Sequence, residues 1–189
     1  MFTQKIDEEI ALKLKEYQDT QKMFALIDAS RKQLSQWMTW VDEVRSPEDV
    51  EKVTRRQLLQ FVKKEAMHFV ILYRDEVAGE ISLKEIDWTI QSGEIGYWLG
   101  SAYTGKGIMA RAVKSMLAYA FEELALHKVE IWAAEENAKS RRIPERLGFV
   151  QEGTRRDDEL IGGKYITMII YGMLENEWHQ AKAKGNKEG

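Results

Sequence analysis

Two glycines flank a lysine in the middle of the chain, at a place where a coenzyme phosphate could bind. A short apolar run ends at Leu99, small and polar residues follow, and Gly105-Lys106-Gly107 leads directly into a long amphipathic pattern. A strand, a glycine turn and a helix start bring free backbone N–H groups together, and the positive end of the helix dipole adds to their attraction for an anion. Glycine also lets a ligand approach closely because it has no Cβ. The turn favours a site for the pyrophosphate of a coenzyme, although an ordinary strand-to-helix connection has the same pattern.

The other groups that could take part in chemistry are hydroxyls, carboxylates and amines. The chain contains no cysteine, so thiolate nucleophiles, disulfides and cysteine-based metal sites are excluded. His68 and His127 open two predicted strands, and His179 lies in the last predicted helix. The three histidines are therefore scattered, and we expect neither a catalytic triad nor a bound metal.

The composition is typical of a globular protein and excludes several classes of partner. Of the 189 residues, 44% are hydrophobic and 31% are charged, and the formal net charge of −3 gives no electrostatic attraction for nucleic acid. No apolar run could span a bilayer, and the first residues lack the apolar region of a signal peptide. We expect a cytoplasmic protein with no membrane partner, built as a single domain over residues 1–189 with a frayed tail at 185–189.

The spacing of apolar residues predicts the elements that position these groups. Alternating or continuous apolar runs predict strands at residues 10–14, 68–73, 77–83, 93–99, 127–133, 149–154 and 164–174. Helical spacing and capping residues predict helices that begin at Asp19 or Thr20, at Ser46-Pro47, after Gly107 and at Asn137, with a terminal helix over 175–184. The strands at 93–99 and 127–133 flank one helix and should be parallel. These elements make a mixed α/β domain.

Three segments have less regular patterns. The helix that begins at Ser46-Pro47 should carry the apolar residues Val50, Val53, Leu58, Phe61 and Val62. Residues 155–163 should form a loop between the last two strands. The apolar segment 37–41 either packs on the core as a helix end or forms a wall of a substrate cleft.

A proline lies inside the predicted helix that runs from Asn137 to Gly148. Pro144 has no backbone N–H, so it removes one hydrogen bond of that helix and leaves the carbonyl of Ser140 free.

Four short motifs together resemble those of the GNAT acetyltransferases. They are Glu94-Ile-Gly-Tyr-Trp-Leu, Gly105-Lys-Gly-Ile-Met, Asn137-Ala-Lys-Ser140 and Arg146-Leu-Gly-Phe149, in this order. More narrowly, they are similar to the branch that contains the bacterial ribosomal-protein N-terminal acetyltransferases of the RimJ/RimL type. The resemblance covers essentially the whole chain. It implies a central, mostly antiparallel sheet, flanked by helices, in which the strands at 93–99 and 128–133 are parallel and diverge at one end.

The resemblance also implies where acetyl-CoA binds as the cosubstrate. Its pantetheine arm would enter between the diverging strands, where backbone N–H groups near Trp98 and Leu99 could polarise the thioester carbonyl. Asn137 would contact the pantetheine amides, cap its helix, or do both. The pyrophosphate would lie on the turn formed by Thr104, Gly105, Lys106, Gly107, Ile108 and Met109.

This turn departs from the family pattern, which is Gln/Arg-x-x-Gly-x-Gly/Ala. The chain has Thr104, Gly107 and Met109 at the three specified positions, so only the central glycine fits. Because the backbone donors remain, we expect the turn to be less finely adapted to the pyrophosphate, but we do not expect the site to be lost. Lys106 and Arg111 would either pair with phosphate or be exposed to solvent.

Two residues match family positions with catalytic roles. Ser140 corresponds to the serine beside the sulfur of CoA, where it would donate a hydrogen bond to the departing thiolate; helix capping is the alternative. Glu159 corresponds to the general base of RimL-type enzymes, and a solvated acid in the predicted loop is the alternative. Glu80 and Glu94 are further base candidates, although we expect each in a structural ion pair.

The function implied by the resemblance is acetyl transfer to an amine. Our first expectation is an enzyme that acetylates the N-terminal α-amine of a protein, in particular a ribosomal protein. The alternatives are a GNAT enzyme that acetylates a small amine (a polyamine, amino-sugar or antibiotic) and a non-catalytic protein that binds acyl-CoA. Trp37, Trp40, Trp88 and Trp132 indicate either core packing or a homo-oligomer contact.

Overall fold

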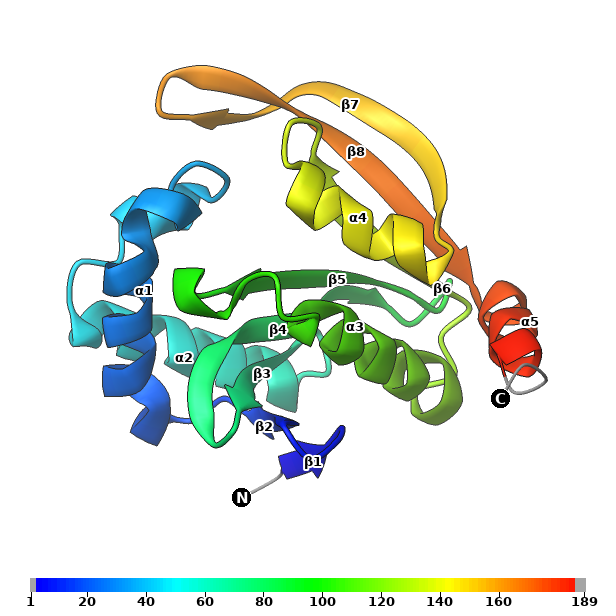
Figure 1. The fold of residues 1–189 in the computed structure, drawn as a ribbon, viewed down its shortest axis with the longest axis horizontal. Helices are drawn as coiled ribbons and strands as arrows, with labels where there is room; N and C mark the ends of the chain where they lie inside the picture. The colour runs from blue at the N-terminus through cyan, green and yellow to red at the C-terminus, as the bar shows by residue number, and fades with distance from the viewer. Residues whose placement is uncertain (1–2, 186–189) are drawn as a thin grey trace.

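The computed structural model describes residues 3–185 (Figure 1). The strands are β1 (Thr3–Lys5), β2 (Ile10–Leu14), β3 (Met67–Tyr73), β4 (Glu76–Asp87), β5 (Ser92–Leu99), β6 (Lys128–Ala134), β7 (Val150–Ile161) and β8 (Lys164–Leu174). The α-helices are α1 (Thr20–Leu34), α2 (Pro47–Val62), α3 (Ile108–Ala118), α4 (Ala138–Leu147) and α5 (Glu175–Gly185). Shorter helical turns are η1 (Tyr17–Asp19), η2 (Thr39–Asp42), η3 (Ser101–Tyr103) and the π-helical η4 (Tyr119–Glu123).

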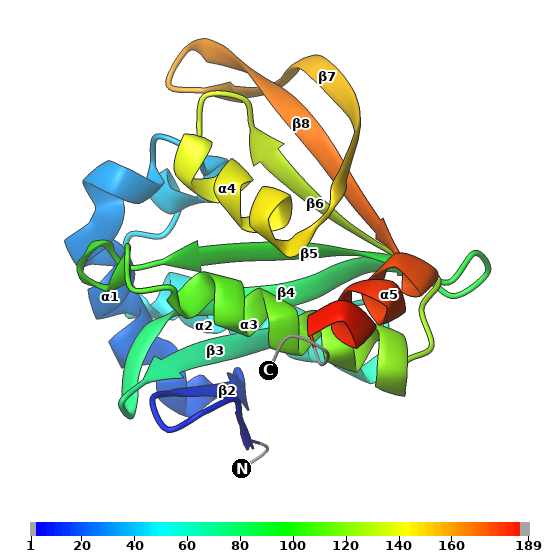
Figure 2. The same cartoon turned by 45° about the vertical axis from the view of Figure 1, so that its right-hand side comes forward.

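All of these strands belong to one sheet, in the order β1-β2-β3-β4-β5-β6-β8-β7. Neighbouring strands are antiparallel except β5 and β6, which are parallel because α3 crosses over between them. In Figures 1 and 2, α1 and α2 cover one face of the sheet and α3 covers the other, while the β7–β8 hairpin rises away from the remaining strands. The predicted fold class, a mostly antiparallel sheet with one parallel pair and flanking helices, is confirmed.

Each face of the sheet buries its own apolar core. Val113 and Leu117 of α3 pack on one face together with Ile95 of β5. Met23 of α1 packs on the other face together with Trp98 of β5. Ile95 and Trp98 lie on opposite faces because side chains alternate along a strand. This alternation gives every residue of β5 a defined side of the sheet.

The predicted loop at residues 155–163 is wrong. These residues belong to β7, which continues to Ile161, and Gly162-Gly163 forms the tip of a hairpin. The register shifts between Arg155 and Glu159, and Asp157 has a left-handed φ of 53°. Such a bulge interrupts the alternation of polar and apolar residues by which a strand is detected in a sequence. Of the predicted frayed tail, residues 186–189 lie outside the described residues, and Gly185 ends α5.

The apolar residues of α2 are only partly buried. Val50 is buried, but Phe61 is 38% exposed and Val62 is 77% exposed. The buried side of the helix includes Thr54, and Gln57 lies on the same side because the spacing from Val50 is four and then three residues. These polar residues face charged groups of the sheet, so hydrophobicity alone does not identify the buried face of α2.

The charged groups beneath α2 form a buried network around Glu80 on β4. Glu80 accepts hydrogen bonds from Lys15 Nζ at 2.7 Å and Gln57 Nε2 at 3.1 Å, and its Oε1 lies 3.0 Å from His68 Nδ1. Burial would raise the pKa of Glu80, but the charges of Lys15 and His68 outweigh it and lower this pKa to about 2. The network joins β2, β3 and β4 to α2.

A second buried ion pair anchors the start of α1. Asp19 occupies the N-cap position of this helix, as predicted, but its carboxylate binds Lys13 of β2 and the N–H of Glu16. The side chain therefore ties α1 to the sheet.

We expect Glu80→Gln to lower the free energy of unfolding at pH 7 by about 3 kcal/mol, because it leaves the buried ammonium of Lys15 without a counter-charge. A lowered folded-state pKa gives stability that is present above the ordinary glutamate pKa of 4.5 and is lost as the pH falls through about 2. The difference from wild type, measured by urea unfolding, should therefore shrink between pH 7 and pH 3. The control is Glu76→Gln, at an exposed position of the same strand; equal stability of the two variants at pH 7 would contradict the prediction.

Candidate active site

Strands β5 and β6 separate in the middle of the sheet. Their parallel pairing is confined to residues 92–94 of β5 and 128–130 of β6. Beyond Glu94 the two strands diverge, and α4 lies over the space between them (Figure 2). The predicted divergence is thus present. It leaves the backbone groups on one edge of β5 without partners on β6.

Strand alternation identifies which N–H group of β5 faces the divergence. The N–H of Gly100 donates to the carbonyl of Ala78 on β4 at 2.9 Å. Successive backbone groups of a strand point to opposite sides, so the N–H of Trp98 also faces β4 and the N–H of Leu99 faces β6. Leu99 therefore offers the backbone donor, and Trp98 contributes its side chain on the α1 face.

The turn after β5 presents a group of backbone donors next to this gap. Gly105 and Gly107 have left-handed φ angles of 78° and 71°, and a Cβ at either would meet open space. Their backbone conformation, rather than crowding within the protein, requires glycine. The N–H of Arg111 donates to the Gly107 carbonyl, so the N–H groups of residues 108–110 lack acceptors within α3. Together with the positive end of α3, they can bind an anion.

The two residues that differ from the expected turn pattern are well accommodated. Thr104 Oγ1 donates to the carbonyl of Ser101 at 3.1 Å, so its short side chain braces the turn locally. Met109 is 5% exposed and lies in the core beneath α3. Its bulk therefore points away from the open side of the turn.

Of the two basic residues near the turn, Arg111 is engaged with carboxylates. Its Nη1 lies 2.8 Å from Asp7 and 3.2 Å from Glu9, both in the β1–β2 connection. This ion pairing is neither of the two expected arrangements. The exposed Lys106 places its ammonium 5.5 Å from the ring centroids of Tyr73 and Tyr103. Lys106 is therefore the basic group left beside the backbone donors.

α1 and the segment after it support the end of β5. Ser30 Oγ accepts a hydrogen bond from the N–H of Ser101 at 3.0 Å, and a Cβ at Gly100 would collide with Leu26. The rings of Trp40 and Trp98 have centroids 5.8 Å apart, and Val41 is fully buried. The segment 37–41 thus packs on the core and also borders β5.

α4 begins and ends where the sequence predicts. Asn137 is its N-cap and accepts a hydrogen bond from the N–H of Ser140 at 3.1 Å, while Gly148 ends the helix with a left-handed φ of 86°. The capping bond uses only the backbone of Ser140. Its hydroxyl donates instead to the hydroxyl of Tyr97 on β5, at 3.3 Å.

Tyr97 is a site residue that the sequence analysis did not single out. Its hydroxyl donates to the carbonyl of Ser140 at 3.1 Å, which is the carbonyl that Pro144 leaves free. Burial raises the pKa of Tyr97 to about 12, and the hydrogen bond with Ser140 only partly offsets this effect. Pro144 was the feature of the sequence that could have pointed to Tyr97. It leaves the carbonyl of Ser140 free, and a buried free carbonyl requires a hydrogen-bond donor from another element.

Glu159 lies on β7, beyond the bulge, and is half-buried. Burial is the main cause that raises the pKa of its carboxyl group; the negative charges of Asp158 and Glu94 add to the effect, and Lys84 opposes it. The charges of Glu94 on β5 and Lys84 on β4 act on Glu159, so both residues lie within electrostatic range of its carboxyl group. A half-buried carboxyl with a raised pKa is suited to accept a proton.

The other two candidate carboxylates are in ion pairs, as expected. Glu80 is held by Lys15, and Glu94 lies 2.6 Å from Lys84 Nζ. Asp158, beside Glu159, lies 2.8 Å from Arg155, whose guanidinium stacks on Trp132. Among the described residues, no ion pair involves Glu159.

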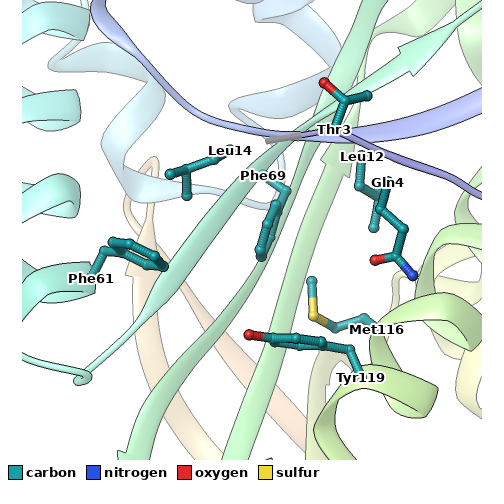
Figure 3. Close-up of a pocket in the computed structure, with 8 residues that line it drawn as sticks. All are labelled: Thr3, Gln4, Leu12, Leu14, Phe61, Phe69, Met116 and Tyr119. Carbon is teal, nitrogen blue, oxygen red and sulfur yellow. The ribbon is translucent and has the colours of Figure 1, made fainter. Parts of the chain in front are cut away.

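A separate apolar cavity of about 390 Å³ lies at the opposite end of α3, under β1 (Figure 3). Leu12, Leu14, Phe61, Phe69, Met116 and Tyr119 line most of it. It contains neither Ser140 nor Glu159, so it is not part of the arrangement described above.

Two general properties of residues 3–185 bear on the kind of site. No three His, Asp or Glu side chains in this range are grouped so that they could hold a metal ion. None of its helices is both long enough and apolar enough to cross a membrane.

Comparison with known proteins identifies relatives over nearly the whole chain. The profile of the family described as "Acetyltransferase (GNAT) domain" matches residues 11–150. The chain is 34% identical to the "Putative ribosomal N-acetyltransferase YdaF" of Bacillus subtilis over 183 residues, which are 96% of this chain and 100% of that protein. It is 26% identical to the ribosomal-protein-serine acetyltransferase of Escherichia coli over 172 residues, which are 91% of this chain and 96% of that protein.

A solved structure with the same fold contains coenzyme A. It is RimL, described as a ribosomal L7/L12 alpha-N-protein acetyltransferase, and it superposes with a TM-score of 0.90. The alignment covers 93% of this chain and 99% of that one, at 21% identity. At this identity the likeness establishes the fold.

We expect Gly107→Ala to weaken CoA binding about fivefold, because a residue with a Cβ costs about 1 kcal/mol in the left-handed conformation of this turn. Isothermal titration calorimetry with CoA measures the effect. The matched control is Gly153→Ala, where a Cβ would meet only Ile170 at 4.0 Å. Equal affinities of the two variants would show that the conformation of the turn does not contribute to coenzyme binding.

Proposed function

The chain belongs to the GNAT acetyltransferase family and uses acetyl-CoA as its acyl donor, and on this basis we propose that it acetylates the N-terminal α-amine of a ribosomal protein. Its relatives in Bacillus subtilis and Escherichia coli are named for ribosomal acetylation, and the chain covers nearly their whole length. The non-catalytic alternative is not supported, since the named relatives are acetyltransferases.

In this proposal the coenzyme occupies the turn after β5 and the gap beside it. The pyrophosphate is bound by the backbone of residues 104–109 with Lys106 beside it. The pantetheine arm passes between β5 and α4, where it reaches Asn137 and Ser140. The thioester carbonyl accepts a hydrogen bond from the N–H of Leu99, and Trp98 packs beneath the acetyl group from the α1 face.

Two observations support the proposed mechanism: the hydrogen bond between Ser140 and Tyr97, and the raised pKa of the Glu159 carboxyl group. Ser140 contacts Tyr97, and Glu159 lies in the electrostatic environment of Glu94. Tyr97 and Glu94 are separated by three positions on one strand, so their side chains point to opposite faces. In our proposal the hydroxyl of Ser140 lies on the coenzyme side of the thioester, and the carboxylate of Glu159 lies on the acceptor side.

This arrangement matches the needs of acetyl transfer. The amine must lose a proton, and the carboxylate of Glu159 accepts it directly or through a water molecule. The amine nitrogen then forms a bond to the carbonyl carbon while the carbon–sulfur bond breaks. The N–H of Leu99 stabilises the negative charge on the carbonyl oxygen, and the hydroxyl of Ser140 donates a hydrogen bond to the departing thiolate.

An α-amine suits a site with one modest base. Its ordinary pKa is about 8, whereas that of a lysine side chain is about 10.4, so an N-terminus is far more easily deprotonated near neutral pH. A carboxyl group with a raised pKa is a stronger base than an ordinary glutamate, and no metal is required to activate the amine.

The substrate prediction is tested by CoA release from acetyl-CoA with three acceptors. These are a lysine-free peptide that begins with serine, the same peptide with a formylated N-terminus and one lysine, and spermidine. We expect turnover with the first alone, with the added acetyl group located on the α-amine by mass spectrometry. Turnover with spermidine but with neither peptide would instead assign a small-amine substrate.

The role of Glu159 predicts a specific pH dependence. We expect Glu159→Gln to lower kcat more at pH 6.5, where most of the α-amine is protonated, than at pH 9, where the neutral amine predominates. Asp157→Asn, two residues away at an exposed position, is the control. A pH–rate profile of E159Q parallel to that of wild type would exclude Glu159 as the base.

A further inference from the structure

The hydroxyl of Tyr97 joins the two sides of the gap. It donates to the carbonyl of Ser140 at 3.1 Å and accepts from Ser140 Oγ at 3.3 Å. Tyr97 belongs to β5 and Ser140 to α4, and these elements border the gap from two sides. One phenol group therefore contacts both the backbone and the side chain of the serine that faces the proposed thioester position.

Pro144 makes this arrangement possible. In a regular helix the N–H of residue 144 would bond to the carbonyl of Ser140, but proline has no N–H. The carbonyl is thus available to the hydroxyl of Tyr97. Pro144 is buried, and its neighbour Ile143 packs against the core of the α3 face, so this part of α4 is fixed.

The protonation state of Tyr97 keeps the arrangement in place over the working range of the enzyme. Burial keeps the phenol neutral, so it remains a donor to the Ser140 carbonyl. With its single proton directed at the carbonyl, the phenol oxygen can only accept from Ser140 Oγ. The hydroxyl of Ser140 must therefore be the donor in this pair, which is the role that a departing thiolate also requires of it.

We propose that Tyr97 is a positioning residue for acetyl transfer, which holds the hydroxyl of Ser140 as a donor oriented for the thiolate of CoA. This inference rests on the proposed role of Ser140. Tyr97 transfers no proton. When the carbon–sulfur bond breaks, the electron pair stays on sulfur, and the Ser140 hydroxyl turns its hydrogen from the phenol oxygen to the thiolate while Tyr97 continues to hold the Ser140 carbonyl.

The first test is the pKa of the thiol of bound CoA, measured from the ultraviolet absorbance of the thiolate. Without its hydrogen-bond donor the bound thiolate is less stable, so we expect Ser140→Ala to raise this pKa by about 1. Tyr97→Phe should raise it by a similar amount, and the double variant should raise it no further than Ser140→Ala alone. Tyr119→Phe, at the cavity beside the opposite end of α3, is the control and should match wild type.

The outcome of this titration is independent of the acceptor, because CoA is the only ligand. It therefore tests the role of Tyr97 even if the proposed acetyl acceptor is wrong. A wild-type thiol pKa in Y97F would overturn the proposal. The proposal would also fail if the effects of the two substitutions on the thiol pKa were additive, so that the double variant had a higher thiol pKa than S140A by the whole shift seen in Y97F.

The second test asks whether Tyr97 positions the Ser140 hydroxyl or only supplies a hydrogen bond to the Ser140 carbonyl. We expect Tyr97→Phe to lower kcat about tenfold while the KM for acetyl-CoA changes less than twofold. Adding Pro144→Ala restores an N–H that can bond to the Ser140 carbonyl, so Y97F/P144A should regain the Tm lost in Y97F but not its kcat or its thiol pKa. Recovery of kcat together with Tm would show that Tyr97 only satisfies the carbonyl, and the proposal would fail.

Discussion

The incomplete pairing of β5 and β6 is the constraint on which the rest of the site depends. A sheet that opens in its middle leaves backbone groups without partners, and such groups are costly to bury unless another group satisfies them. The pairing ends after residues 94 and 130, and α4 spans the opening. Leu99 can then direct its N–H to a ligand, and Tyr97 can reach Ser140. The gap is therefore a polar edge of the sheet held open for an extended molecule.

Several interactions keep the borders of this gap fixed. α1 supports the end of β5 through Ser30 and Leu26, and the Lys13–Asp19 pair ties the start of α1 to β2. The network around Glu80 joins α2 to the middle of the sheet. These contacts lie on the α1 face, opposite the proposed coenzyme side. Rigid support of this kind holds catalytic groups in position more closely than a flexible loop could.

The environments of three ionisable groups shift their pKa values in ways that match the roles we propose for them. Lys15 and His68 lower the pKa of Glu80 to about 2, so it remains a carboxylate and has little tendency to accept a proton. Burial and nearby negative charge raise the pKa of Glu159, which suits a base. Burial raises the pKa of Tyr97 to about 12, which keeps it a neutral donor. The pKa of the same residue type, glutamate, thus shifts in opposite directions in one sheet because its neighbours differ.

The sequence by itself determined the features that depend on residues close along the chain. The glycine turn, the apolar face of α3, the capping of α4 by Asn137 and Gly148 and the free carbonyl created by Pro144 are all local, and so is the order of the motifs. Turns, caps and helical spacing follow from steric limits and hydrogen bonds over a few residues, so a single sequence can reveal them. The bulge in β7 was missed because it interrupts a local pattern, and the polar face of α2 was missed because its partners lie on distant strands.

Only the tertiary structure decided which of these groups meet. Glu159 is separated from Glu94 by 65 positions, and Tyr97 is separated from Ser140 by 43. The hydrogen bonds between Tyr97 and Ser140 depend on the crossover at α3, and the electrostatic effect of Glu94 on Glu159 depends on the course of the β7–β8 hairpin. Likewise, the carboxylates that bind Arg111 come from the β1–β2 connection. Periodicity in a sequence specifies which side of an element is buried, but the partner across that surface is set by the packing of the whole chain.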